Sequence, residues 1–86
     1  MFVIVVYDVN AKRTNKALKI CRKYLDHVQK SVFEGTITES KLKYLKNELA
    51  QVIVKDEDSV MIYKFETLKY TSKEVIGLGM QGGNCL

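Results

Sequence analysis

The sequence is poor in the residues that build disulfide-linked or metal-bound scaffolds. It contains two cysteines, Cys21 and Cys85, and a single histidine, His27. The cysteines lie far apart, and neither belongs to a CxxC pair or has a histidine at ligand spacing. We therefore expect no disulfide framework and no zinc or multi-histidine site, and we expect His27 to be structural or solvent-exposed.

Long apolar runs are also missing. No stretch of about 18 apolar residues occurs, which predicts a protein without a membrane-spanning helix. The opening segment "MFVIVVYD" lacks the basic start and the small-residue cleavage site of a secretory signal, and it ends in Asp8. With 86 residues, 47% of them hydrophobic, we expect one globular domain in the cytoplasm, with no membrane partner.

Hydrophobic periodicity predicts two helices. Asn10 is a candidate N-cap for a helix over 11–25, and Thr38 for a second helix with Glu39 in its first turn. Each helix has one apolar stripe at helical spacing. The stripes consist of Ala17, Ile20, Cys21, Tyr24 and Leu25 in the first helix and Leu42, Leu45, Leu49, Val52 and Ile53 in the second.

The remaining apolar segments predict strands. Residues 2–7 and 59–65 are apolar at odd and even positions, which is typical of strands covered on both faces. Residues 27–37 form either one bent strand or two short ones, with Gly35 marking a kink, bulge or turn. A short last strand is expected over 72–79. The domain is expected to span 1–80, followed by a flexible tail over 81–86.

This order of elements predicts an α+β fold, a ferredoxin-like sandwich in which a mainly antiparallel sheet carries two helices on one face. Two helices cover only one side of the sheet. Because the predicted strands are apolar on both sides, the second face needs a partner, and a second copy is the simplest one. We therefore expect a homodimer packed sheet to sheet.

Asp8 ends the first predicted strand on the face of Phe2, Ile4 and Val6. Ligands commonly bind at this carboxyl end of a strand, just before a helix. If the face lies on the dimer axis, two Asp8 carboxylates meet and either share a proton or bind a divalent cation, Mg²⁺ or Mn²⁺. The alternative is that Asp8 only caps the next helix or satisfies a loop.

The first predicted helix carries positive charge alone. The sequence has no Asp or Glu between Asp8 and Asp26, and the helix contains Lys12, Arg13, Lys16, Lys19, Arg22 and Lys23. Helix surfaces usually mix charges to gain stabilising pairs one turn apart. Binding of a polyanion such as duplex DNA explains the bias, and an ordinary solvated basic face is the alternative. Cations of the second helix extend this surface: Lys41, Lys43 and Lys46.

Four segments resemble a known family. "VIVVYDV", "CRKYL", "VQKSVFEG" and "DSVMIYKF" occur in the same order in the CRISPR-associated endoribonucleases, the small subunit of the spacer-acquisition complex of antiviral defence. The resemblance covers roughly residues 1–80. It implies a ferredoxin-like homodimer whose last strand can cross to the other protomer. Such dimers bind duplex DNA and bridge two dimers of the CRISPR integrase, and the last strand and tail are the expected contact.

The resemblance also implies site residues. Some members of the family are metal-dependent nucleases that act on single-stranded RNA or double-stranded DNA, and Asp8 matches their catalytic carboxylate, the proposed magnesium ligand at the dimer axis. Positions around the cleft and basic face, which are candidates for binding nucleic acid, match at Tyr7, Arg13, Arg22, Ser31 and Phe33. The alternative for Tyr7 and Phe33 is a place in the core, and for Ser31 an ordinary polar strand position.

Several functions fit this sequence. In the first, Mg²⁺ between two Asp8 carboxylates activates a water for phosphodiester cleavage. Because the sequence places no histidine near this acid, we rank a DNA-bridging scaffold above a catalyst. A free-standing, toxin-type messenger RNA endoribonuclease and a plain ferredoxin-like binding module rank below both.

Overall fold

The computed structural model describes residues 1–65 and 71–77, with side chains described up to Phe65 and at Ile76. The predicted tail over 81–86 lies outside these residues. In chain order the elements are β1 (Phe2–Asp8), a 3₁₀ helix η1 (Ala11–Arg13), α1 (Thr14–Arg22), β2 (Asp26–Gln29), β3 (Val32–Thr36), α2 (Glu39–Val52), β4 (Ser59–Phe65) and β5 (Thr71–Gly77). Neither described α-helix is long and apolar enough to cross a membrane.

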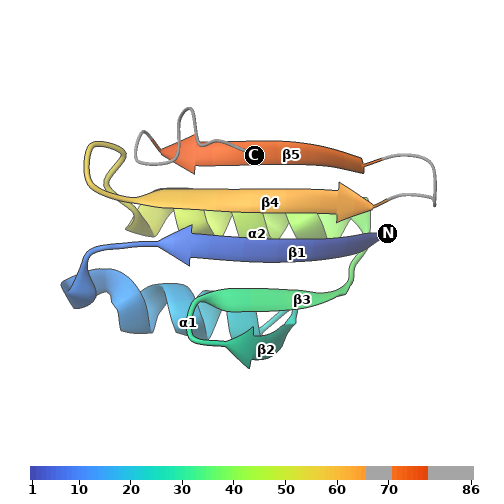
Figure 1. Ribbon diagram of the computed structural model, residues 1–86, viewed down its shortest axis with the longest axis horizontal. Coiled ribbons are helices and arrows are strands. Elements are labelled where there is room, and N and C mark those ends of the chain that lie inside the picture. Colours follow the sequence, from blue (N-terminus) through green and yellow to red (C-terminus); the bar gives the residue numbers. More distant parts are fainter. Residues whose placement is uncertain (66–70, 78–86) are drawn as a thin grey trace.

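The strands form one sheet with the order β2-β3-β1-β4-β5, and every neighbouring pair is antiparallel. Both α-helices lie on the same face of this sheet (Figure 1). The predicted α+β, ferredoxin-like architecture is therefore confirmed. β5, which includes the strand expected to cross to a partner, pairs here with β4 of the same chain.

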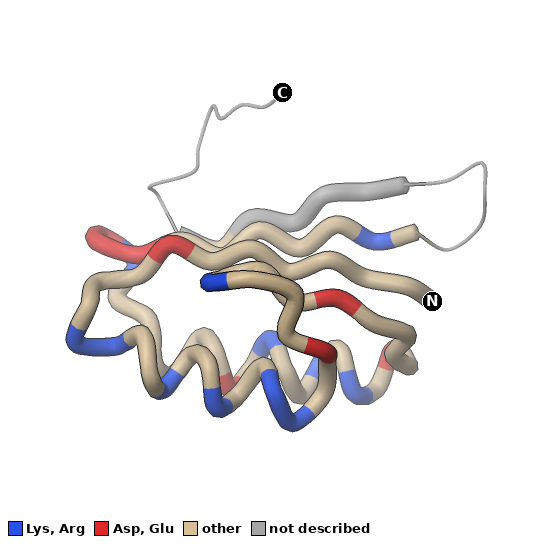
Figure 2. Tube along the Cα trace, turned by 60° about the horizontal axis from the view of Figure 1, so that its bottom comes forward, with Lys and Arg blue, Asp and Glu red and all other residues tan. Residues whose placement is uncertain are grey.

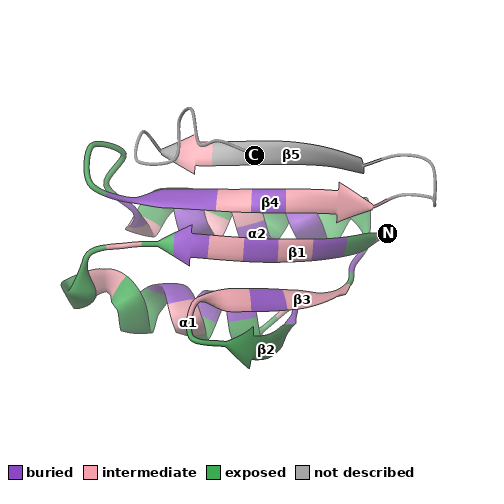
Figure 3. Ribbon diagram, in the orientation of Figure 1, coloured by how far each residue is buried: buried purple, intermediate pink, exposed green. Residues whose placement is uncertain are grey.

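Strand β1 lies in the middle of the sheet, and its side chains alternate between two environments. Val3, Val5 and Tyr7 are buried on the helix side, whereas Ile4 and Val6 are half-buried on the other (Figure 3). This alternation follows from the two-residue period of a strand. Apolar residues on both faces of β1 were predicted, and the structure has them.

The predicted caps and stripes of the helices are confirmed. The side chain of Asn10 accepts a hydrogen bond from the Lys12 N–H, and that of Thr38 accepts one from the Lys41 N–H, each at 3.1 Å. The buried stripe residues within the helices are Ala17, Ile20 and Cys21 in α1 and Leu42, Leu45 and Leu49 in α2, and the predicted stripe residues Leu25 and Ile53 are buried just beyond the helix ends. Tyr24 and Val52 are only partly buried but pack against this core.

The predicted first helix, 11–25, extends too far at its C-terminal end, and it is not α-helical throughout. Its first three residues form a 3₁₀ turn closed by a 2.8 Å hydrogen bond from the Arg13 N–H to the Asn10 carbonyl, and α1 ends at Arg22. Leu25 stays buried after the helix has ended, so the apolar period continues into the turn. The chain must leave the helix there because β2 begins at Asp26.

Residues 27–37 contribute to two strands rather than one bent strand, because a turn at Lys30 and Ser31 divides the segment. Gly35 does not mark this turn; it lies inside β3, opposite Val3 of β1. The irregularity falls in β2 instead, where the pairing register shifts between His27 and Gln29. The predicted strand over 72–79 is β5, with bounds Thr71–Gly77.

The sheet face that the helices do not cover is apolar around β1 and β4. Ile4 lies opposite Tyr63, and Val6 lies opposite Met61; all four side chains are half-buried. At the far end, the rings of Phe2 and Phe65 lie 6.2 Å apart, and Phe2 is 38% exposed. We call this set of six residues the free face.

Candidate active site

Asp8 lies in a pocket at the carboxyl end of β1. The carboxylate belongs to the last residue of the strand, opposite Ser59 of β4, and it is exposed. The pocket has a volume of about 300 Å³ and is lined by Tyr7, Asp8, Val9, Thr14, Leu18, His27, Lys30 and Ser31. Three elements therefore meet here: the end of β1, the start of α1 and the β2–β3 hairpin.

Asp8 does not cap the helix that follows. The N-cap is Asn10, and among the described residues the Asp8 carboxylate takes part in no hydrogen bond or ion pair. The alternative in which Asp8 is a capping residue is wrong. A carboxylate that folding leaves without a partner is available to a ligand.

The β2–β3 hairpin contributes three polar residues to the pocket that Asp8 lines. Lys30 and Ser31 form its turn, and the Ser31 carbonyl accepts a 3.1 Å hydrogen bond from the Tyr7 N–H. His27 comes from β2, and its ring stacks on Phe33 with centroids 4.5 Å apart. The sequence places no histidine near Asp8, but the fold brings His27 into the same pocket.

His27 and Lys30 were not among the predicted site residues, although the sequence holds a signal for them. Antiparallel pairing of Val5 with Phe33 and of Val6 with Val32 places the hairpin turn beside the end of β1. Dividing residues 27–37 into two strands would have predicted this arrangement. As long as the segment could also be one bent strand, the turn had no defined place.

Two of the predicted nucleic-acid-binding residues are core aromatics. Phe33 is fully buried and Tyr7 is 3% exposed, and their stacked rings lie 6.1 Å apart. Burial raises the pKa of the Tyr7 hydroxyl, with a smaller contribution from Cys21. Stacking of a base on Phe33 would require the core to open. Ser31, by contrast, lies in the turn and lines the pocket.

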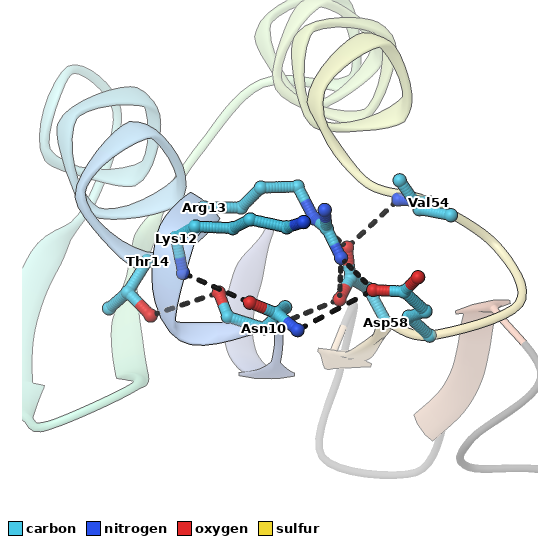
Figure 4. A network of polar contacts seen from close by, with 7 residues as sticks. Asn10, Lys12, Arg13, Thr14, Val54 and Asp58 are labelled. Carbon is cyan, nitrogen blue, oxygen red and sulfur yellow. Dashed lines mark hydrogen bonds and ion pairs between the residues drawn. The ribbon is translucent and has the colours of Figure 1, made fainter.

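Arg13 is held by acidic residues of the loop between α2 and β4. Its Nε donates to Asp58 at 2.6 Å, and its terminal nitrogen Nη2 donates to Glu57 at 2.7 Å and to Asp58 at 3.0 Å. Figure 4 shows this side chain reaching from the start of α1 across to the loop. Because the guanidinium is engaged in this way, Arg13 is a poorer candidate for phosphate contact than its neighbours.

Asp58 is completely buried and accepts hydrogen bonds from three residues. Besides Arg13, the N–H groups of Asn10 and Val54 donate to its two oxygens, each at 2.8 Å. The Arg13 hydrogen bonds, aided by those two backbone groups, lower the pKa of Asp58 to about 2. The carboxylate therefore ties η1 and the residue before it to Val54, just beyond the end of α2. We call Arg13 and Asp58 the closed pair.

The other predicted cations lie along the outer side of the helix layer (Figure 2). Lys23 forms an ion pair with Glu48, which also accepts a hydrogen bond from the Tyr24 hydroxyl. These two donors lower the pKa of Glu48. Among the described residues, four exposed cations of this region have no acidic partner: Lys12, Lys16, Lys19 and Arg22.

One copy of the chain offers limited ligands for a metal. Among the described residues, no three His, Cys, Asp or Glu side chains are grouped so that they could hold an ion. Mg²⁺, however, keeps several waters and commonly takes one or two carboxylates together with phosphate oxygens. The exposed Asp8 carboxylate fits that pattern when substrate phosphate or a second Asp8 completes the site.

Comparison with known proteins decides the family. The model of the family "CRISPR associated protein Cas2" matches residues 1–73. The chain belongs to the Cas2 family. The CRISPR-associated endoribonuclease Cas2 of Dictyoglomus turgidum is 49% identical over 78 residues, which cover 91% of this chain and 90% of that protein. The relative of the same name from Thermotoga maritima is 47% identical, with the same coverage.

Solved Cas2 structures have the same fold. A crystal structure of a Cas2 protein is 38% identical and superposes with a TM-score of 0.74, covering all of this chain and 97% of the other. The Cas2 of Streptococcus pyogenes at pH 6.5 is 37% identical with a TM-score of 0.70, covering 76% of this chain and 86% of the other. The resemblance inferred from the four sequence segments is therefore confirmed.

Proposed function

We propose that this Cas2 family member is a metal-dependent nuclease that cleaves phosphodiester bonds of single-stranded RNA, with Asp8 as the carboxylate that binds the catalytic metal. The observation that carries the proposal is the unpaired Asp8 carboxylate in a pocket shared with Lys30, His27 and Ser31. The relatives from Dictyoglomus turgidum and Thermotoga maritima are called endoribonucleases, which supports this choice of substrate.

The charged residues of the pocket and of the basic face divide the work of cleavage and binding. Mg²⁺ or Mn²⁺ bound at Asp8 would supply an activated water and would offset charge on the phosphate. The protein's own part is to hold that carboxylate at a fixed place on a central strand. The free cations of α1 would hold the rest of the strand by its backbone, without reading bases.

We include the homodimer in the proposal. The free face leaves Ile4, Val6, Met61 and Tyr63 only half-buried in the single chain, and a second copy packed on it would bury them. Asp8 ends the same strand face, so two copies would bring two Asp8 carboxylates towards the axis. A Val6→Lys variant should be monomeric in sedimentation equilibrium at micromolar concentration, whereas an exposed control, Gln51→Lys, should remain dimeric.

A second candidate function is the DNA-bridging scaffold between CRISPR integrase dimers. The observation that favours it is the row of cations on η1 and α1 that have no acidic partner among the described residues, since duplex backbones attract such a surface. Family membership favours either CRISPR function over a free-standing toxin. The two functions are compatible, because both use the basic face to hold a nucleic-acid backbone and only cleavage requires the Asp8 pocket.

The test follows magnesium-dependent cleavage of labelled single-stranded RNA and duplex DNA by wild type and Asp8→Asn, with duplex binding measured on the same samples. The proposal expects RNA cleavage by wild type and a loss of about 100-fold or more in Asp8→Asn. Duplex binding that depends steeply on salt, without Asp8-dependent cleavage of either substrate, would reject the nuclease and leave the scaffold.

A further inference from the structure

Lys30 has an unusual backbone conformation beside Asp8. Its φ is +35°, and it is the one non-glycine residue with positive φ among those that the structure describes. Side chains with a Cβ rarely adopt this left-handed region, and lysine is not among the residues that favour it. Such strain persists only where the surroundings impose it, and it is concentrated at functional sites.

Contacts on both sides of Lys30 impose this conformation. The Lys30 carbonyl accepts a hydrogen bond from His27, and because a carbonyl only accepts, the Nε2 of that ring carries the hydrogen. His27 is itself fixed by its stacking on the fully buried Phe33. The next residue, Ser31, is tied to the backbone of β1 through the Tyr7 N–H. The turn is therefore attached to the core and to the strand that carries Asp8.

The side chains of Lys30 and Asp8 carry opposite charges in one pocket without pairing. Both line it, and no ion pair within 4.0 Å joins them in the described part of the chain. We call Lys30 and Asp8 the open pair. A phosphate group complements such a pocket, because its oxygens accept from an ammonium on one side and coordinate a metal held by a carboxylate on the other.

We propose that Lys30 is a phosphate-binding residue of the Asp8 pocket and that His27 is a positioning residue that holds Lys30 there. The inference rests on the proposed nuclease function, which it extends by assigning the contact to substrate. Lys30 binds the phosphodiester at the Asp8 pocket, and His27 acts only through the turn. The strained conformation keeps Lys30 at the pocket that Asp8 also lines.

Variants at Lys30 separate its charge from its backbone conformation. Asn tolerates the left-handed region, so Lys30→Asn keeps the turn and removes the ammonium, whereas Lys30→Arg keeps the charge. Lys55→Asn is the matched control, since Lys55 is an exposed lysine of the α2–β4 loop outside the pocket. Binding of a fluorescent ten-nucleotide RNA is measured in EDTA in the Asp8→Asn background, and cleavage is measured in the Asp8 background with Mg²⁺.

We expect Lys30→Asn to weaken binding about tenfold and to reduce the slope of log affinity against log salt by about 0.7, the share of one phosphate contact. Cleavage should fall at least as much. Lys30→Arg should retain most of both activities, and Lys55→Asn should match its parent. Equal binding by Lys30→Asn and Lys55→Asn would overturn the inference, whether or not wild type cleaves RNA.

The positioning role of His27 has its own readout. His27→Phe keeps an aromatic ring to stack on Phe33 but cannot donate to the Lys30 carbonyl. If His27 acts through Lys30, the double variant His27→Phe/Lys30→Asn should bind no more weakly than Lys30→Asn alone. Additive losses would overturn the positioning role. Cleavage that is lost in Asp8→Asn but unchanged in Lys30→Asn would reject the Lys30 assignment while leaving the nuclease intact.

Discussion

Two pairs of opposite charges lie at the same end of the sheet and differ in burial and in pairing. In the closed pair, the Asp58 carboxylate is buried, contacts Arg13 at 2.6 Å and receives further hydrogen bonds from backbone. In the open pair, Asp8 and Lys30 are exposed side chains of one pocket that do not form an ion pair with each other. The two acids are close in the sheet, because Asp8 is paired with Ser59, the residue after Asp58.

The difference indicates how the chain divides its charges between folding and function. A buried charge without a partner costs several kcal/mol, so Asp58 requires Arg13. An exposed charge loses little by staying unpaired, and it can be kept for a ligand. The closed pair holds together the two loops that flank the end of β1. The Asp8 side of the open pair lies at that same strand end.

Breaking the closed pair should have the largest effect on folding. Asp58→Ala leaves the Arg13 guanidinium, whose side chain is 12% exposed, without its main partner, and it strands the N–H groups of Asn10 and Val54. We expect the free energy of unfolding to fall by about 3 kcal/mol or more in urea titrations. Glu57→Ala, which removes a half-exposed acid from the same arginine, should cost less than about 1 kcal/mol. Equal losses would contradict the assignment.

The closed pair also predicts a dependence of stability on acid. Because Arg13 and the backbone donors lower the pKa of Asp58 to about 2 from 3.8, the folded chain holds this proton less tightly than the unfolded chain. The stabilisation is therefore complete above about pH 4 and is lost as the pH falls towards 2. Thermal unfolding of wild type and Asp58→Asn between pH 5 and pH 2 should show a shallower fall for the variant. Parallel curves would exclude this contribution.

A third pair of opposite charges separates the effect of burial from the effect of pairing, because its two side chains form an ion pair but stay partly exposed to solvent. Lys23, with its side chain 56% exposed, pairs with Glu48, which is 31% exposed. Lys23→Ala should lower the free energy of unfolding by no more than about 0.5 kcal/mol, and high salt should remove the difference. A loss comparable to that of Asp58→Ala would show that burial is not what separates the two classes of pair.

Sequence patterns predicted the elements of the fold better than they predicted its charged partners. The strands and helix stripes follow from periods of 2 and 3.6, which are local properties of the chain, and Asn10 and Thr38 were recognised as caps by their place before each stripe. Asp8 was recognised by its position at the end of an apolar strand. The pairing of Arg13 with Asp58 could not be predicted in this way, because 45 residues separate them and the segment "VKDEDS" reads as a polar loop.

Lys30 illustrates why part of the candidate site could not be predicted from the sequence. Its role depends on the hairpin turn and on the register between β1 and β3, which no local pattern specifies. Arg13 shows the reverse: a cation in a basic helix was assigned to nucleic acid by its neighbours in sequence, and its neighbours in space give it a structural contact. Counting charges along the helix identified the basic face but could not separate its free cations from its paired ones.

The most direct test of this division measures two properties of two variants side by side. Asp8→Asn and Asp58→Asn are compared with wild type for their free energy of unfolding and for magnesium-dependent cleavage of single-stranded RNA at a low temperature where all three are folded. We predict that Asp8→Asn keeps its stability within about 0.5 kcal/mol and loses cleavage, whereas Asp58→Asn loses stability and keeps cleavage. A folded Asp8→Asn protein that cleaves RNA like wild type would contradict the account.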